Sequence, residues 1–421
     1  MSSTVAISNR QYRPVSGSKL GFPAELIMSI LQYAAGGDDD GSGDRDLNVL
    51  RAACFVCKSW SPCAQVLLFR TIELPTMSLL RSFRSLIDSR DNGRMFSSAV
   101  RCLRIHVDIN IGCDIIHPHD MGKILFQLPN LRTLYVNLNN VIEFPLPSLG
   151  LLRQSESPIK TLCIVNAYPS QVGAARQLLH RFPTIHTLKF CPVEDSSSNN
   201  DEPNPNLVSS GHFNWTDDSH ATVAPRLKRL EIPDFKLEFR NFMEECAPAL
   251  HTLWIGDIPM DSIADAASRV AKCANLKELM LDHLPPPSIL SVLPPTLEHL
   301  SIADRFMHPH LEFPSIKFTT VALQKSPSLC ALTLTQVRDY SDPKIIELKA
   351  KCELLGIEFQ DDRLPLDPPS ATRSPVHSVS DNTWVVQDSK HKSIGLRVFG
   401  WFFFLFFSQT FLSLFSGGNV Q

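Results

Sequence analysis

Residues 131–136 read Leu-Arg-Thr-Leu-Tyr-Val, and this short pattern decides the fold of the chain. An apolar residue is followed by two residues of any kind, a second apolar residue, one residue of any kind and a third apolar residue. The last two apolar residues are two positions apart, so in a strand they point to the same face and the residue between them points to the other. The pattern therefore predicts a strand with one buried face and one outward face.

The pattern recurs along most of the chain. Its ten copies are Val100/Leu103/Ile105, Leu131/Leu134/Val136, Ile159/Leu162/Ile164, Ile185/Leu188/Phe190, Leu227/Leu230/Ile232, Leu250/Leu253/Ile255, Leu276/Leu279/Leu281, Leu297/Leu300/Ile302, Leu329/Leu332/Leu334 and Leu354/Ile357/Phe359. Successive first positions are 31, 28, 26, 42, 23, 26, 21, 32 and 25 residues apart. Most steps are close to the roughly 20–29 residues of a leucine-rich repeat, in which stacked units bury a continuous core. One such spacing is common in any α/β domain, but ten ordered copies favour the repeat.

The segments between the copies complete the predicted repeat. Helical patterns occur at Gln171–Phe182, Ser262–Cys273 and Lys344–Leu355, so each unit would supply a strand and a helix. The step of 42 residues contains an insertion, 191–222, which is rich in Ser, Asn, Asp and Pro and is expected to form a projecting loop. The Asn or Cys that usually follows the strand of a leucine-rich repeat is present only as Asn139, which predicts an irregular array.

Residues 20–75 predict a separate helical unit, preceded by a polar lead-in over 1–19 that we expect to be disordered. A first helix would place on one face Leu26, Ile27, Ile30, Leu31 and Ala34. A second helix, capped by Asp46, would carry Leu47, Leu50, Cys54 and Cys57. Ser61-Pro62 is a start signal for a third helix, and Phe69–Leu74 alternates like a strand.

The order of motifs in this helical unit resembles the F-box. Phe22-Pro23-Ala24-Glu25-Leu26-Ile27 and then Val56-Cys57-Lys58-Ser59-Trp60 are similar to that family's Leu-Pro-x-Glu-Leu and Val-Cys-Arg-x-Trp. Phe22 stands in place of leucine, Lys58 in place of arginine, and the loop Gly36–Asp46 is longer than usual. The resemblance implies an α/β chain with a small three-helix F-box at 20–75. An irregular leucine-rich-repeat solenoid of parallel strands and helices would follow at 76–360.

The resemblance also implies a function. In the F-box family the helices bind a Skp-type adaptor, which connects to the cullin and RING subunits of a ubiquitin ligase. Carried over to this sequence, the candidate adaptor contacts are Phe22, Pro23, Leu26, Ile30, Leu31, Cys57 and Trp60. The alternative is that these residues only fill the core of the helical unit. Trp60 favours a contact, because aromatic residues dominate interface hot spots.

The outward positions of the repeat strands are the candidate site for an unidentified protein target. By alternation they include Tyr135, Lys189, Arg229, Trp254, Met280 and Asp282. The alternative is a solvated face without a partner, and a large aromatic at an outward position favours binding. The predicted function is a substrate-recognition subunit of a Skp/cullin/F-box ubiquitin ligase, without catalysis of its own. The alternative function is a non-ligase leucine-rich-repeat scaffold, with the C-terminal tail as a candidate membrane tether.

Composition excludes several other classes. The net charge of −3 and the absence of charge runs argue against a nucleic-acid protein with a basic stripe. The 11 cysteines, without a signal peptide, indicate reduced thiols in the cytoplasm or nucleus. Cys54-x-x-Cys57 has no second ligand pair for zinc, and a cluster of Cys113, His117, His119 and Asp120 completes no known motif. We therefore predict no metal and no cofactor.

The C-terminal region departs from this picture. Residues 361–393 predict a disordered linker, and 394–421 form a hydrophobic tail. Val398 to Phe415 is free of charge and would extend about 27 Å as a helix, close to the thickness of a bilayer core. One interpretation is a membrane anchor that leaves the rest of the chain in the cytosol, with Arg397 on its N-terminal side. The others are a cap on the repeats and an errant extension of the gene model.

Overall fold

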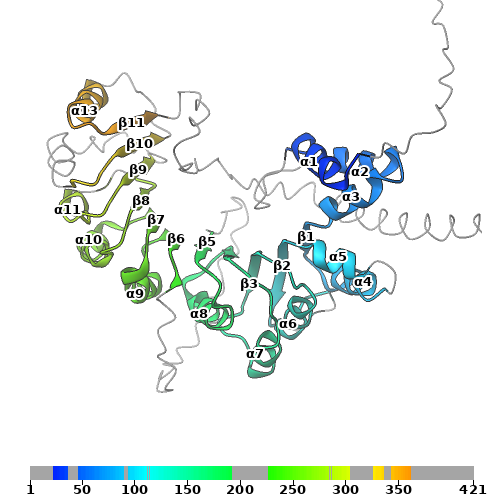
Figure 1. The fold of residues 1–421 in the computed structure, drawn as a ribbon. Coiled ribbons are helices and arrows are strands. Elements are labelled where there is room, and N and C mark those ends of the chain that lie inside the picture. Colours follow the sequence, from blue (N-terminus) through cyan, green and yellow to red (C-terminus); the bar gives the residue numbers. More distant parts are fainter. Residues whose placement is uncertain are drawn as a thin grey trace, which may run out of the picture. The chain divides into compact units, whose positions relative to one another are not determined.

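A computed structural model of the chain describes residues 22–36, 46–89, 93–191, 226–303, 326–335 and 343–361, except positions 111, 113, 284 and 286. These residues all belong to one compact unit, Met1–Val193 with Asn200–Leu364 (Figure 1). The predicted lead-in, the hydrophobic tail, all but the first residue of the linker and all but Cys191 of the insertion lie outside the described residues.

The fold is built on one open sheet of 11 parallel strands in sequence order. The strands are β1 Thr71–Leu74, β2 Cys102–Asp108, β3 Thr133–Asn139, β4 Thr161–Val165, β5 Thr187–Phe190, β6 Arg229–Asp234, β7 Thr252–Asp257, β8 Glu278–Leu281, β9 His299–Ala303, β10 Ala331–Thr335 and β11 Glu358–Asp361. Helices alternate with these strands, which confirms the predicted α/β class and the repeat-like parallel architecture.

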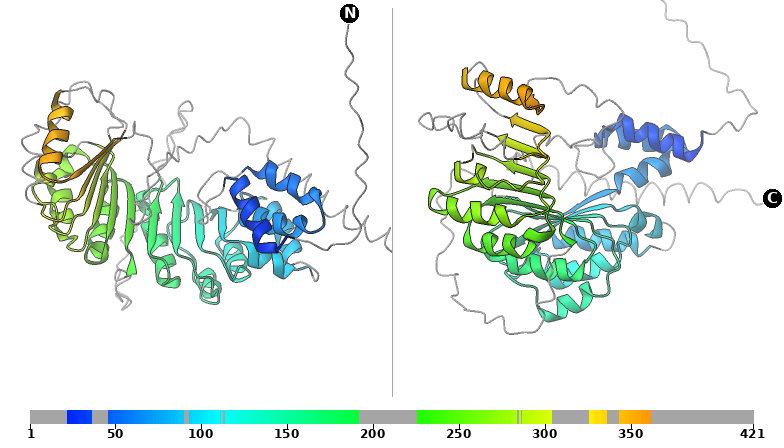
Figure 2. Two further views of the ribbon diagram at one scale, coloured as in Figure 1. Left: turned by 45° about the horizontal axis from the view of Figure 1, so that its top comes forward. Right: turned by 60° about the vertical axis from the view of Figure 1, so that its left-hand side comes forward.

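The helices of the sheet region are α4 Met77–Ile87, α5 Gly93–Ala99, α6 Pro118–Phe126, α7 Leu146–Leu152, α8 Val172–Arg181, α9 Leu237–Cys246, α10 Ile263–Lys272, α11 Pro287–Leu290 and α13 Pro343–Leu354. Single 3₁₀ turns are η1 Pro169–Gln171, η4 Ala247–Ala249 and η5 Met260–Ser262. Figures 1 and 2 show the helices from α6 onward along one side of the sheet. The opposite face of the strands therefore carries the alternate side chains.

The register of the sheet follows the spacing of the sequence copies. Leu134 pairs with Leu162, and Leu162 pairs with Leu188, so the middle apolar positions form one column across the strands. These three leucines are each 0% exposed, as expected for residues that face the helices. The paired residues are separated by the same steps as the sequence copies from the first to the ninth.

The tenth copy, Leu354/Ile357/Phe359, is in the wrong register. Phe359 pairs with Leu332, the middle position of the previous copy, so it is a middle position rather than a last one. Leu354 is 81% exposed at the end of α13. Gly356 ends this helix with φ of +70°, and the N–H of Ile357 donates to the carbonyl of Cys352 at 2.9 Å. The end of a helix at a glycine thus reproduces the spacing of apolar residues that marks the start of a strand in the other copies.

The longest step is bridged by three phenylalanines. Phe190 of β5 packs against Phe239 and Phe242 of α9, with ring centroids 4.8 Å and 6.1 Å apart. All three rings are almost fully buried. From the preceding helix α8, Arg176 places its guanidinium 5.8 Å from the centroid of Phe242. This phenylalanine cluster joins the repeats before the insertion to those after it.

Strands β6 and β7 approach closely at a proline. Asp234 pairs with Asp257, which places Pro233 opposite Gly256. A Cβ atom added to Gly256 would lie 2.0 Å from the carbonyl oxygen of Pro233. Proline has no N–H for the ladder, and β5 pairs with β6 only as far as Glu231. Glycine thus fits where no side chain can.

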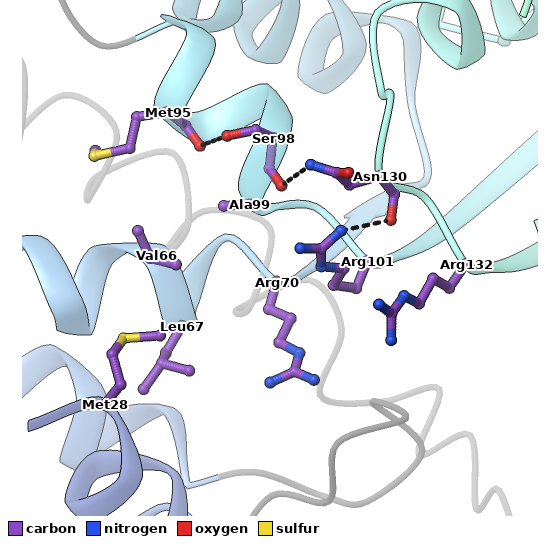
Figure 3. Close-up of a pocket in the computed structure, with 10 residues that line it drawn as sticks. All are labelled: Met28, Val66, Leu67, Arg70, Met95, Ser98, Ala99, Arg101, Asn130 and Arg132. Carbon is purple, nitrogen blue, oxygen red and sulfur yellow. Dashed lines mark hydrogen bonds between the residues drawn. The ribbon is translucent and has the colours of Figure 1, made fainter. Parts of the chain in front are cut away.

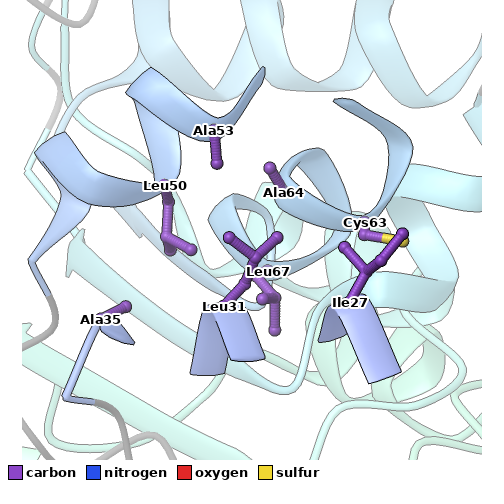
Figure 4. Close-up of a cluster of buried hydrophobic side chains, with 8 residues drawn as sticks. All are labelled: Ile27, Leu31, Ala35, Leu50, Ala53, Cys63, Ala64 and Leu67. Atoms are coloured by element: carbon purple, nitrogen blue, oxygen red, sulfur yellow. The ribbon is translucent and has the colours of Figure 1, made fainter. Parts of the chain in front are cut away.

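Three helices precede β1, namely α1 Ala24–Ala34, α2 Leu47–Val56 and α3 Trp60–Leu68. Their shared core, drawn in Figure 4, consists of Ile27, Leu31, Ala35, Leu50, Ala53, Cys63, Ala64 and Leu67. Helix α3 begins at Trp60, earlier than the predicted start at Ser61-Pro62. Pro62 still lies in the first turn, where the backbone N–H groups have no partner within the helix.

Asp46 caps α2 as predicted, because its carboxylate accepts from the N–H groups of Asn48 at 2.9 Å and Val49 at 3.3 Å. We expect Asp46→Ala to lower the free energy of unfolding by about 1 kcal/mol, the usual loss for a removed cap. Chemical denaturation followed by circular dichroism measures this change. Glu347→Ala, at an exposed position of α13, is the control and should stay within about 0.5 kcal/mol. Equal effects of the two substitutions would contradict the capping role.

Candidate functional site: an apolar helical patch and the strand face

Helix α1 has two apolar faces. Ile27 and Leu31 are buried in the helical core, whereas Leu26 and Ile30 are 45% and 41% exposed. A helix at a water-exposed surface normally has one apolar stripe, so the second stripe is available for another surface. Large apolar side chains also emerge from the neighbouring helix. We call the apolar patch the exposed side chains Phe22, Leu26, Ile30, Tyr33, Leu47, Phe55 and Val56.

The predicted adaptor contacts divide between this patch and the core. Phe22, Leu26 and Ile30 belong to the patch, and Pro23 and Cys57 are exposed beside it in sequence. Two predicted contacts lie elsewhere. Leu31 is 2% exposed and fills the core, so it presents no surface, and Trp60 is half-buried against the same core. The spacing of apolar residues in the first helix predicts that they share one face, so it did not separate the buried Leu31 from the exposed Leu26 and Ile30.

Sequence reasoning missed four residues of the patch. Tyr33 is 91% exposed, the most exposed of these side chains, and Phe55 and Val56 protrude at the end of α2. Leu47 was predicted on the buried face of α2, but the core uses Leu50 and Ala53 instead. Phe55 is five residues after the buried Leu50 and so lies about 140° around the helix from it, which is the signal that could have found it.

Cys57 follows α2, and its thiol lies 3.1 Å from the hydroxyl of Ser59. The hydrogen bonds from the Ser59 side chain and from the Trp60 backbone hold the pKa of this exposed thiol below its usual value.

The second candidate surface is the strand face, which we define as the side chains that alternate with the buried core positions of β2–β11. A cluster of ion pairs lies at the centre of this face. Glu231 of β6 accepts from Arg229 at 2.7 Å on the same strand and pairs with Lys189 of β5 at 3.1 Å. Arg229 and Lys189 were predicted to contact a target, and both are already engaged with this one carboxylate.

A second cluster continues toward β11. Glu278 accepts from the hydroxyl of Thr252 at 3.1 Å and lies 3.3 Å from Nδ1 of His299. Nε2 of His299 is 2.8 Å from the hydroxyl of Thr333, which donates to Gln360 at 3.2 Å. Burial acts to raise the pKa of Glu278, but the hydrogen bond from His299, the charges of Arg229 and His299 and the Thr252 hydroxyl together lower it. This network links five neighbouring strands, β7 to β11.

Trp254 is tied to its neighbour rather than freely exposed. Its indole N–H donates to the carboxylate of Asp282 at 2.8 Å. Asp282 and Met280, two of the predicted target contacts, are 7% and 6% exposed, so they offer little surface to a target. Neighbouring parallel strands are only about 4.8 Å apart, and adjacent side chains on the outward face bury one another. Alternation in the sequence predicts which face of the sheet a side chain occupies, but it does not predict how side chains of neighbouring strands pack against it.

Tyr135, near the start of the sheet, is also packed against the side chains of neighbouring strands. The guanidinium of Arg104 on β2 lies 5.1 Å from the centroid of its ring. Burial, together with the neighbouring thiols Cys163 and Cys102, raises the pKa of the Tyr135 phenol well above its usual value. Cys163 is itself buried beside it, and burial raises the pKa of that thiol too. Aromatic, polar and charged groups thus form a closely packed surface.

No metal site is assembled from the described residues, among which no group of three His, Cys, Asp or Glu is close enough to hold an ion. Of the cluster considered from sequence, His117 caps α6, where its ring accepts from the N–H of His119, and Cys113 lies outside the described ranges. Within those ranges, no helix combines the length and apolar character needed to cross a bilayer. The candidate anchor Val398 to Phe415 lies outside them.

Comparison with known proteins gives no further assignment: no protein-family model matches the chain, and no curated protein matches its sequence.

Proposed function

We propose that this chain is the substrate-recognition subunit of a Skp/cullin/F-box ubiquitin ligase. In this proposal the helices α1–α3 are an F-box that docks a Skp-type adaptor, which brings the cullin and RING subunits. The strands β2–β11 belong to a leucine-rich-repeat array whose strand face holds a protein target for ubiquitination. The chain itself performs no catalysis.

The observation that carries this proposal is the apolar patch. Three residues of the F-box-like segment, Phe22, Leu26 and Ile30, point away from the helical core into solvent. They are among the residues for which the F-box resemblance implies adaptor contact. Leu26, Ile30 and Tyr33 follow one another at i, i+4 and i+7 on α1, and exposed apolar side chains that share one face mark protein interfaces. The patch and the resemblance arise from independent properties, solvent exposure and residue identity, and they agree at these positions.

The strand face supports the second half of the proposal. It carries the half-buried Trp254, the Lys189–Glu231–Arg229 ion pairs and the Glu278–His299 network. Aromatic and arginine side chains held in fixed positions lose little entropy when they bind. The hydrogen bonds and ion pairs hold these side chains in defined positions, so the strand face is suited to bind a target of one shape.

The adaptor-docking role is tested by a charge placed in the apolar patch. We expect Leu26→Glu/Ile30→Glu to weaken binding to a purified Skp-type adaptor at least about a hundredfold, because two unpaired carboxylates would be buried at the interface. Both positions are exposed and glutamate favours helices, so folding should be preserved. Isothermal calorimetry measures the affinity, and circular dichroism checks the fold.

A matched control is Leu146→Glu/Leu237→Glu, which changes two leucines that are 83% and 60% exposed next to the sheet. This variant should bind the adaptor like the unchanged chain. Full binding by the patch variant would overturn the assigned interface. Failure of the unchanged chain to bind any Skp-type adaptor or cullin would favour the non-ligase scaffold instead.

A further inference from the structure

One position of the repeat is occupied by a basic residue in strand after strand. It is the residue just before each strand, at the sheet edge where the parallel strands begin. We call the basic row the residues at this position in eight consecutive repeats, which are Arg70, Arg101, Arg132, Lys160, His186, Lys228, His251 and Lys277. Each member after Arg70 donates its backbone N–H to the carbonyl of the member before it, with N···O distances of 2.7–3.0 Å. The row is therefore continuous across eight strands.

The side chains of the row are close enough to repel one another. Burial lowers the pKa of Arg101, and the charges of Arg132 and Arg70 lower it further. In the middle of the row, burial and the charges of Lys160 and Lys228 lower the pKa of His186. Like charges on adjacent strands destabilise a sheet. The near-neutral net charge of the sequence does not reveal this row, because successive members are 23–42 residues apart and meet only in the folded sheet.

The members of the row differ in how their charge is compensated. Lys277, the last member, pairs with Glu298 of the next repeat at 2.8 Å. Arg132, Lys160 and Lys228 are exposed and form no ion pair with any residue in the described part of the chain. On the strand face, by contrast, Glu231 neutralises two cations at once. The arginine and lysine members therefore give the row positive charge on a chain whose net charge is −3.

The first end of the row opens into a cavity of about 430 Å³, shown in Figure 3. Arg70, Arg101 and Arg132 line it together with Ser98 and Asn130, and the rest of the lining is apolar: Met28, Val66, Leu67, Met95 and Ala99. Arg101 donates to the backbone carbonyl of Asn130 at 3.1 Å, which fixes the direction of its guanidinium. Three guanidinium groups beside one hollow make a place where an anionic group is stabilised.

We propose that the basic row is a docking surface for an extended acidic polypeptide segment, whose most anionic part enters the three-arginine cavity. Seven steps between adjacent strands of about 4.8 Å give the row a length of roughly 34 Å. An extended chain of about ten residues covers this distance. Such a segment would place carboxylates along the row and relieve the repulsion among its members.

The neighbours of the row favour a polypeptide over nucleic acid or a membrane. On one side the row is flanked by buried residues such as Leu131, Ile159 and Ile185, and on the other by Thr133, Thr161 and Thr187. Binding of single-stranded nucleic acid combines cations with exposed aromatic rings that stack on bases, and no such ring flanks the described row. Membrane binding needs exposed apolar side chains beside the cations, and these are also missing from its flanks.

The test uses the purified full-length chain without an adaptor, so it does not depend on the proposed ligase role. The probe is a fluorescent peptide of about ten glutamates, and its binding is followed by fluorescence anisotropy at low and high salt. We expect binding that weakens as salt increases and a loss of about tenfold in Lys160→Glu/Lys228→Glu. The control Lys123→Glu/Lys349→Glu makes the same change of net charge on helices α6 and α13, and it should alter binding less than twofold.

Three outcomes would overturn the proposal. The first is no binding of the peptide at low salt. The second is an equal loss in the row variant and in the control variant, which would mean that only total charge matters. The third is a row-dependent affinity for an oligothymidylate of similar length, or for phosphatidylserine vesicles, that exceeds the affinity for the peptide.

Discussion

Replacing Phe242 by alanine is expected to lower the free energy of unfolding by about 3–5 kcal/mol, the usual loss when a fully buried phenylalanine is truncated. The ring lies between Phe190 of β5 and Arg176 of α8, while Phe242 itself belongs to α9. Its removal leaves a void at the junction that bridges the longest step of the array. Chemical denaturation followed by tryptophan fluorescence and circular dichroism measures the loss.

The same experiment should also show a loss of cooperativity. In a repeat array each unit is stabilised mainly by its neighbours, so a weakened junction lets the two sides unfold separately. We expect two transitions in the Phe242→Ala variant where the unchanged chain shows one across this junction. Phe126→Ala is the control, because that ring is 59% exposed, and its effect should stay within about 0.5 kcal/mol. Similar losses at Phe126 and Phe242 would contradict the role of the cluster.

Gly256→Ala is expected to destabilise the chain by about 3 kcal/mol or more, although it adds a single methyl group. The new Cβ would lie 2.0 Å from the carbonyl oxygen of Pro233, and the backbone of β6 would have to move away. Small-to-large changes are mild when a flexible side chain can yield, but here the obstacle is main chain. The midpoint of thermal unfolding measures the effect.

The matched control is the same substitution at Gly150. This glycine lies within helix α7 and is exposed, and no atom lies within 4 Å of an added Cβ. Alanine loses less conformational entropy in a helix than glycine does, so Gly150→Ala should stabilise the chain by about 0.5–1 kcal/mol. The two variants are expected to shift the unfolding midpoint in opposite directions. A neutral Gly256→Ala would show that β6 and β7 do not approach as closely as described.

The strands were predictable because burial is periodic in this sequence. A residue such as Leu162 is fixed by its spacing from Ile159 and Ile164, and each copy repeats the same rule. Parallel neighbours then align without further information, since strands of successive repeats pair in sequence order. The same rule failed at Leu354, where the end of a helix and Gly356 reproduce the spacing by another route.

The candidate sites were less predictable because they depend on which neighbours meet. Leu31 and Ile30 are adjacent apolar residues of one helix, and only the packing of α1 against α3 decides that Leu31 is buried. Met280 and Asp282 alternate correctly to the outward face, but side chains of the adjacent strands cover them. The basic row was not predicted, because its members are far apart in the sequence. The net charge of the chain is also close to zero, so it gives no sign of a local cluster of positive charge.

Strand β11 stands at the end of the sheet order, so within the described residues only one of its edges has a partner. An edge strand exposes backbone N–H and C=O groups that can recruit a strand from another molecule. Here the strand is only four residues long and carries Glu358 and Asp361 at its ends. Short length and negative charge are two means by which natural sheets prevent such addition. Loss of these two carboxylates would turn this edge into a template for end-to-end association between copies of the chain.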